Sequence, residues 1–232
     1  STIDWGGSIT FFAPGVVVYS NPQRLVNVAV GWFDGTDKFE TLFSQPFFIG
    51  QLSFNTHNDE RVGTYRIYAW TRRTPHCGNS DDPSQFLDCE LIPAAQQRRL
   101  GGQNSGVGIS MDQQLSPSIG VWSRLGFEDP KVSQFDKAIN VGLDITMTAM
   151  RREYDHLGIA YGLTMPSHAY KAASGYSSNE HYAELYYKYV ISGDGFTTGF
   201  HVSSDIQIIA NAAGNGAVGP VVIYGIRGQA HF

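Results

Sequence analysis

Hydrophobic and polar residues alternate along much of this chain, most clearly in the last eleven residues, Val222 to Phe232. Side chains of a β-strand point to opposite faces in turn, so every second residue shares a face. A strand with one apolar and one polar face is typical of a barrel wall whose outside contacts lipid. The apolar face here carries Val222, Tyr224, Ile226, Gly228, Ala230 and Phe232, and the other carries Ile223, Gly225, Arg227, Gln229 and His231.

Strand periodicity occurs in eleven segments, whose lengths suit tilted strands that cross a bilayer. The pattern predicts an all-β fold, a transmembrane antiparallel β-barrel of the outer-membrane type, as a single domain over residues 1–232. The predicted strands are 8–19, 24–34, 46–56, 61–73, 105–115, 118–128, 134–149, 155–165, 181–192, 195–210 and 218–232.

The connections between these segments alternate between short and long. Outer-membrane barrels have this asymmetry, with tight periplasmic turns and longer extracellular loops. If the chain ends in the periplasm, every long connection is extracellular, including the longest, residues 74–104. Eleven is an odd number of strands, whereas bacterial single-chain barrels have even numbers. We therefore expect that N-terminal strands of a longer barrel are missing from this chain.

Composition agrees with a strand-rich protein and excludes two other classes. Glycine (26), phenylalanine (14) and tyrosine (12) are frequent and only 16% of residues are charged, which favours aromatic strands joined by glycine turns. The net charge of -5, with scattered basic residues, argues against a nucleic-acid partner. No stretch approaches the roughly 18 to 20 consecutive apolar residues of a membrane-spanning helix, so a helical membrane protein is excluded.

The two cysteines, Cys77 and Cys89, lie in the 74–104 connection and flank a polar stretch rich in turn residues. Neither a Cys-x-x-Cys motif nor a zinc-ligand spacing is present, so no metal site is predicted. We predict a disulfide that closes this loop in an oxidising compartment, which implies export; two free thiols are the alternative.

The inward faces of the predicted strands carry charged and aromatic side chains. Unpaired buried charges are costly, so water must reach this face. Both signs are mixed, which gives no strong ion preference, and aromatic rings beside hydrogen-bonding groups suit neutral carbohydrates. Alternatively, the rings pack against loops and the arginine–carboxylate pairs brace the wall. The predicted lining and substrate-contact residues are Arg66, Tyr68, Trp70, Trp122, Arg124, Glu184, Lys188, Asp205, Gln207 and Arg227, with Asp112, Asp144, Tyr182 and Tyr186 on the same face.

Five stretches, in order, carry a resemblance to a known family. They are 63–70 (GTYRIYAW), 106–115 (GVGISMDQQL), 119–126 (IGVWSRLG), 184–188 (ELYYK) and 204–209 (SDIQII). From about residue 45 to its end, the chain resembles the carbohydrate-selective porins of the OprB type. The resemblance implies an outer-membrane barrel of about sixteen strands that passes sugars by diffusion.

The family's lining pattern carries over to five positions, which also face inward by the alternation: Arg66, Arg124, Glu184, Asp205 and Gln207. Lys188 stands where the family more often has arginine. Because lysine lacks the bidentate fork of arginine, this position departs from the pattern.

No catalytic arrangement emerges from the sequence, and neither an enzyme nor a cofactor is predicted. Seven histidines are scattered, and neither a His-x-x-x-His nor a Gly-x-Ser-x-Gly motif occurs. Glu180 and Glu184 share a strand face, but roughly 13 Å separates such positions, which is too far for glycoside hydrolysis.

The preferred hypothesis is a passive porin for sugars and other small hydrophilic solutes in the bacterial outer membrane. The alternatives are a structural or plugged outer-membrane barrel, for example an envelope tether, and a secreted soluble β carbohydrate-binding module. The expected partners are sugars as solutes, the lipid bilayer and the barrel-assembly machinery, which the terminal Phe232 would contact. A homotrimer is a further hypothesis.

Overall fold

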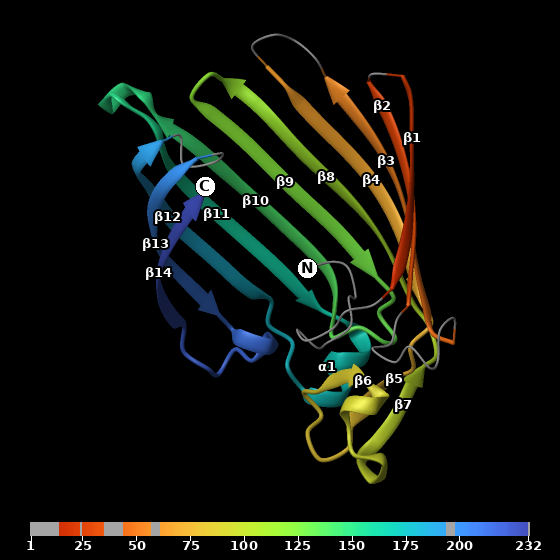
Figure 1. Cartoon of the computed structure of the whole chain (residues 1–232). Coiled ribbons are helices and arrows are strands. Elements are labelled where there is room, and N and C mark those ends of the chain that lie inside the picture. The colour runs from red at the N-terminus through yellow and green to blue at the C-terminus, as the bar shows by residue number, and fades with distance from the viewer. Residues whose placement is uncertain (1–13, 24, 35–43, 57–60, 194–197, 232) are drawn as a thin grey trace.

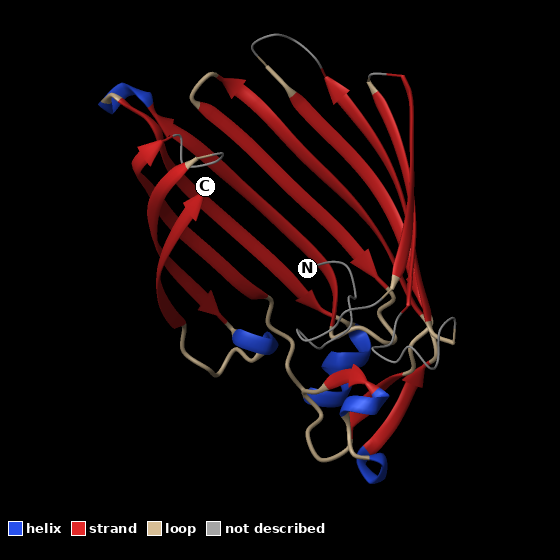
Figure 2. Ribbon diagram, viewed as in Figure 1, coloured by secondary structure: helices blue, strands red, loops and turns tan. Residues whose placement is uncertain are grey.

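The computed structural model describes residues 14–23, 25–34, 44–56, 61–193 and 198–231, most of which belong to one large sheet (Figure 2). Among these residues the sheet has eleven strands, so the predicted all-β fold is confirmed. The strands are β1 (Gly15–Gln23), β2 (Val26–Asp34), β3 (Pro46–Thr56), β4 (Gly63–Arg72), β8 (Asn104–Ser116), β9 (Ile119–Glu128), β10 (Phe135–Met147), β11 (Arg152–Pro166), β12 (Glu180–Gly193), β13 (Gly199–Ala210) and β14 (Val221–His231).

All neighbouring strands of this sheet pair antiparallel, in the order β1-β2-β3-β4-β8-β9-β10-β11-β12-β13-β14. The sheet curves into a wall with two ends (Figure 1). The turn end carries the short connections 117–118 and 148–151, and the loop end carries the longer connections 73–103, 129–134, 167–179 and 211–220. In the described part of the chain β1 and β14 are the edges of the sheet, and they do not pair with each other.

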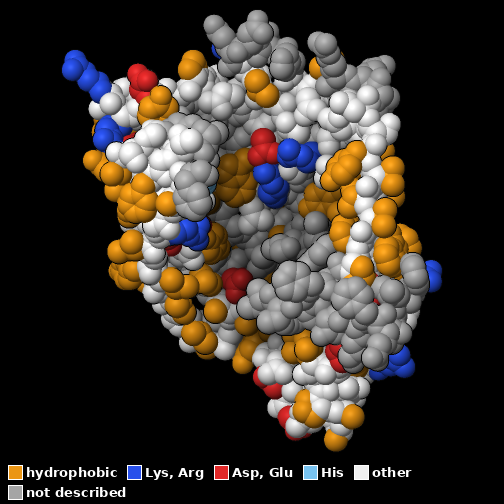
Figure 3. Space-filling model, viewed as in Figure 1, with side chains coloured by type: hydrophobic (Ala, Val, Ile, Leu, Met, Phe, Trp, Pro, Cys, Tyr) orange, Lys and Arg blue, Asp and Glu red, His pale blue; other side chains and the backbone are white. Residues whose placement is uncertain are grey.

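The strand register gathers the predicted apolar stripes on the convex face of the wall. Ile67 lies opposite Ile109, which lies opposite Leu125, and Leu125 lies opposite Ile139. The three isoleucines of this row are exposed. Figure 3 shows apolar side chains along the outer flanks of the molecule. A continuous exposed apolar face of this kind fits contact with lipid.

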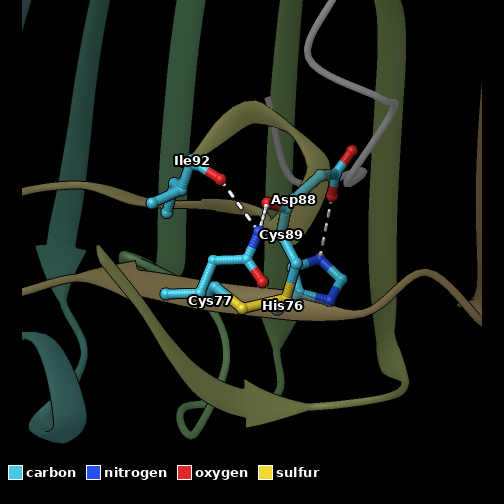
Figure 4. Close-up of a disulfide and its surroundings, with 6 residues drawn as sticks. His76, Cys77, Asp88, Cys89 and Ile92 are labelled. Atoms are coloured by element: carbon cyan, nitrogen blue, oxygen red, sulfur yellow. Dashed lines mark hydrogen bonds and ion pairs between the residues drawn. A yellow bond between two sulfur atoms is a disulfide. The ribbon is translucent and has the colours of Figure 1, made fainter. Parts of the chain in front are cut away.

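Residues 73–103 form a small module instead of the plain loop that the sequence predicts. Its sheet has the order β6-β5-β7, and the disulfide Cys77–Cys89 links β5 to the turn after β6 (Figure 4). The predicted disulfide is therefore confirmed. The alternation missed these strands because they have only four, three and five residues. They are β5 (His76–Asn79), β6 (Phe86–Asp88) and β7 (Gln97–Gly101), with the 3₁₀ turns η2 (Cys89–Leu91) and η3 (Ala94–Gln96).

One α-helix, α1 (His168–Ser174), lies in the connection between β11 and β12, where the sequence predicts only a loop. The Ser167 side chain accepts a hydrogen bond from the Tyr170 backbone N–H, and Gly175 ends the helix in the left-handed conformation. Two further 3₁₀ turns are η4 (Thr148–Met150) and η5 (Ala212–Gly214). None of the helices in the described residues has the length and apolar character needed to span a membrane.

The first strand differs most from its predicted bounds. β1 continues to Gln23, although the sequence assigns Ser20 to Gln23 to a turn. Its pairing with β2 becomes irregular between Ser20 and Gln23, and an edge strand tolerates such irregularity because it pairs on one side only. Residues 8–13 of the predicted strand, and Phe232, lie outside the described residues.

Candidate functional site on the concave face

The predicted lining residues lie on the concave face of the sheet, because residues opposite each other in register share a face. Arg66 lies opposite Ser110, and Ser110 lies opposite Arg124. Lys188 and Arg227 both lie opposite Ser203. Figure 3 shows acidic and basic side chains within the hollow of this face. The alternation in the sequence therefore corresponds to the two faces of the sheet.

Arg66, Asp112 and Arg124 form one ion-pair cluster across β4, β8 and β9. Arg66 Nη1 donates to Asp112 Oδ2, and Arg124 Nη2 donates to Asp112 Oδ1, both at 2.6 Å. Arg124 Nη1 also donates to the Met111 carbonyl oxygen at 2.8 Å. The side chains of the three charged residues remain 34–40% exposed. The cluster fixes the two guanidinium groups on the wall while leaving them in contact with water.

Asp144 is the centre of a second polar cluster, across β10, β11 and β12. Its Oδ1 atom is 2.6 Å from His156 Nδ1, and its Oδ2 atom accepts a hydrogen bond from the Tyr186 hydroxyl at 2.9 Å. Lys188 lies opposite His156 in register and interacts electrostatically with Asp144. The predicted residue Lys188 is only 8% exposed, so it belongs to the wall more than to the open surface.

The third cluster joins β12 and β13. The Tyr182 hydroxyl donates to Glu184 Oε2, and Gln207 Nε2 donates to Asp205 Oδ1 at 3.2 Å. Gln207 Nε2 also lies 3.5 Å from Glu184 Oε1, directly across the strand pair. These contacts bring together three of the residues selected from the sequence: Glu184, Asp205 and Gln207. Arg227 lies on β14 and is exposed.

The aromatic residues selected from the sequence fall into two groups. Trp122 is half-buried, lies beside the Asp112 cluster and has the Arg124 guanidinium carbon 5.4 Å from its ring centre. Tyr68 is also half-buried. Trp70, by contrast, is 4% exposed and stacks on Phe47 with ring centres 6.0 Å apart. Little of the Trp70 ring is therefore accessible to a solute.

Two hollows on the concave face are large enough for small polar solutes. One has a volume of about 520 Å³ and is lined by Thr64, Asp112, Gln114, Trp122 and Asp144, among others. The other, about 250 Å³, is lined by amide, hydroxyl and guanidinium groups. Its lining includes Tyr19, Asn27, Gln51, Asn55 and Arg66. Both hollows combine hydrogen-bonding groups with an aromatic ring, which is the chemistry of a site for neutral polar ligands.

The loop end is packed around Tyr170, which is fully buried. The Tyr170 ring meets Phe86 of the disulfide module edge-to-face at 5.4 Å and Phe135 at 6.0 Å. Its hydroxyl donates to the Ala213 carbonyl oxygen at 2.8 Å. Burial raises the pKa of the Tyr170 hydroxyl. One tyrosine therefore joins the disulfide module, α1 and the connection before β14.

Two functional features of the concave face escaped the sequence-based selection. The strand of His156 carries mostly small residues on its inward face, so the sequence gives no periodic signal for one large residue there. The position of a glycine opposite an aromatic residue depends on strand register, which the sequence pattern does not give. No group of three or more His, Cys, Asp or Glu side chains in the described ranges is placed to hold a metal ion.

The curved antiparallel sheet, apolar outside and polar inside, is the architecture of outer-membrane β-barrel proteins. The structure is similar to the high-pH structure of Pseudomonas putida OprB, with a TM-score of 0.69 and 16% identity over 93% of this chain. Pseudomonas aeruginosa OpdK with vanillate (TM-score 0.55, 10% identity) and OprD from the same organism (0.53, 9%) cover 93% and 94% of this chain. This chain spans 58% of the OprB structure, 56% of OpdK and 60% of OprD.

The family model described as "Carbohydrate-selective porin, OprB family" matches residues 4–232, so the chain belongs to the OprB family. The predicted resemblance and the bacterial outer-membrane location are thereby confirmed. The family to which the chain belongs is described as one of porins. Comparison with curated protein sequences gives no significant match.

Proposed function

We propose that the protein of which this chain is part is a passive outer-membrane channel for sugars and other small hydrophilic solutes. The observation that carries the proposal is the larger hollow, where the half-buried Trp122 ring lies beside Asp112 and Asp144. A sugar ring presents an apolar C–H face rimmed by hydroxyl groups. An aromatic ring next to carboxylates and guanidinium groups can contact both parts.

The distribution of charge supports neutral solutes. Asp112 is shared between Arg66 and Arg124, and Asp144 lies between His156, Tyr186 and Lys188. A wall that pairs most of its charges exerts a weaker field on ions than a ring of one sign. The fixed ion pairs still offer hydrogen-bond donors and acceptors to hydroxyl groups.

We propose that further strands complete the barrel between β14 and β1, and that the loop end is extracellular. The support is that both edge strands pair on one side only in the described residues, whereas unpaired backbone cannot face hydrocarbon. The family's long-loop asymmetry supports the orientation, with the 74–104 connection outside the cell. Recognition of Phe232 by the assembly machinery and a homotrimer remain hypotheses from sequence.

Swelling of liposomes that contain the full-length protein tests the function. We expect liposomes in isosmotic hexose or disaccharide to swell faster than protein-free liposomes, with rates that fall as the solute becomes larger. Equal rates with and without protein would contradict diffusion and favour a plugged or structural barrel. Faster entry of charged solutes than of neutral sugars of similar size would contradict the sugar preference.

A further inference from the structure

Five aromatic residues of the concave face share one structural feature: each lies directly opposite a glycine on the neighbouring strand. A side chain at such a glycine would occupy the space beside the ring. The glycines therefore determine where the rings can lie. The pairs are Tyr68–Gly108, Trp70–Gly106, Trp122–Gly142, Tyr182–Gly162 and Tyr186–Gly158.

In four pairs the ring lies over the glycine, Trp70 over Gly106 among them, whereas a Cβ atom added to Gly162 would first meet the Asn140 side chain. A Cβ atom added to Gly142 would overlap the Trp122 ring, and one added to Gly158 would overlap the Tyr186 ring. A Cβ atom added to Gly108 would likewise overlap the Tyr68 ring. Trp122 and Tyr186 are half-buried. A ring over a glycine has one face covered by backbone, and of these two rings Trp122 also lines the larger hollow.

The Trp122 and Tyr186 rings approach the same part of the wall from opposite sides. Trp122, on β9, covers Gly142 of β10. Tyr186, on β12, covers Gly158 of β11 and reaches Asp144 of β10 with its hydroxyl, at 2.9 Å. Gly142 and Asp144 are two residues apart, so they share the concave face. Two rings, a glycine floor and a carboxylate thus meet over β10 and β11.

Glycines in this sheet do not all have aromatic cover. A Cβ atom added to Gly50 of β3 would have no atom within 4 Å. Successive side chains of a strand point to opposite faces, and Gln51 lines the smaller hollow on the concave face. The neighbouring Gly50 therefore lies on the convex face. An aromatic ring over a glycine also stabilises a sheet, so a purely structural role must be separated by experiment.

We propose that Gly142 and Gly158 are positioning residues for sugar passage. By leaving no side chain beneath Trp122 and Tyr186, they hold the two rings flat and present ring faces to the apolar side of a pyranose. The inference rests on the proposed function. It adds that discrimination among sugars depends on Gly142 and Gly158 as well as on the two rings. We expect the rings to favour sugars with an unsubstituted C–H face.

Current block by a neutral oligosaccharide tests the proposal in single channels of the full-length protein. The test variant is Gly142→Ala, and the matched control is Gly50→Ala, which adds the same methyl group to a strand without touching a ring. We expect about three- to tenfold weaker block in Gly142→Ala, the range that an aromatic contact contributes, and unchanged block in Gly50→Ala. Equal block in wild type, Gly142→Ala and Gly50→Ala would overturn the proposal.

A double variant separates positioning from stability. If Gly142 acts through the Trp122 ring, the Trp122→Ala/Gly142→Ala double variant should show the same sugar block as Trp122→Ala alone. A further loss as large as that caused by Gly142→Ala in the wild type would overturn the proposal. Gly158→Ala with Tyr186→Ala provides the second test if Gly142→Ala does not insert. If the oligosaccharide blocks the wild-type channel and blocks all glycine variants equally well, only this inference fails. If sugar does not block the wild type, the proposed function fails.

Discussion

Two of the arginine–aspartate ion pairings in the described residues have different surroundings. At the loop end, Arg72 and Asp88 make a two-pronged pair at 2.9 and 2.6 Å, and their side chains are only 3% and 7% exposed. On the concave face, Arg66, Asp112 and Arg124 are 34–40% exposed. The first pair anchors the disulfide module to the end of β4. The second cluster leaves its polar groups accessible to solutes.

The exposure of an ion pair to water decides its role. Removing one partner from a buried pair leaves an unpaired charge without water, whereas an exposed pair contributes little to stability. We therefore expect substitutions at the loop end to change stability and substitutions on the concave face to change transport.

The largest effect is expected for Asp88→Asn. The Arg72 guanidinium would then be buried without its carboxylate, at a cost of about 3–5 kcal/mol in the local stability of the module. Hydrogen exchange of residues 76–101 in the full-length protein measures this loss. Glu90→Gln, an exposed carboxylate in the same module, is the control. Equal exchange in both variants would show that the buried pair does not anchor the module.

Loss of the disulfide should have the next largest effect. Cys77 and Cys89 are 12 residues apart, and closing a loop of this size contributes about 3 kcal/mol. Reduction, or the Cys77→Ser/Cys89→Ser variant, should speed proteolysis within the module without changing strand content by circular dichroism. Proteolysis at the wild-type rate would argue against this contribution.

A smaller effect, of about 1 kcal/mol, is expected for Tyr170→Phe, which loses the hydrogen bond to the Ala213 carbonyl oxygen. Burial raises the pKa of Tyr170 above its ordinary value of 10.0, so the folded state favours the neutral hydroxyl. This contribution is complete below about pH 10 and decreases as the pH rises toward the folded-state pKa. Protection of the α1 amides relative to their intrinsic exchange rates should fall in this range for wild type; an equal fall in Tyr170→Phe would assign it to another group.

The smallest stability effect is expected for Asp112→Asn, at most about 1 kcal/mol because the cluster is exposed. Transport should respond instead, since Arg66 and Arg124 would lose their shared carboxylate. We expect the reversal potential in a salt gradient to shift toward anion selectivity. Glu153→Gln, an exposed carboxylate near the turn end, is the control and should leave selectivity unchanged. A shift toward cations in Asp112→Asn would contradict the assigned geometry.

The sequence predicts the sheet well because the alternation acts over whole strands. It separates Ile67 from Arg66 and places them on opposite faces without knowledge of the partner strand. The pairing of Arg66 with Asp112 could not be predicted, because it depends on the register between β4 and β8. The glycine beneath Trp122 depends in the same way on the register between β9 and β10.

The loop end was predicted less completely. The polar, turn-rich stretch between Cys77 and Cys89 favours the disulfide that the structure contains. The strands around it are too short for periodicity, and α1 has seven residues. Tyr170 holds three connections together through contacts far apart in sequence, with Phe86 and Ala213, which no local pattern encodes.

Block of single-channel current by a neutral oligosaccharide, compared between Trp122→Ala and Phe127→Ala, tests whether sugars pass along the concave face. Trp122 faces the larger hollow, whereas Phe127 is exposed on the convex face of the same strand. The account predicts that Trp122→Ala weakens block about tenfold and that Phe127→Ala leaves it unchanged. Equal block in both variants and the wild type would contradict the claim that the concave face is the pathway for sugars.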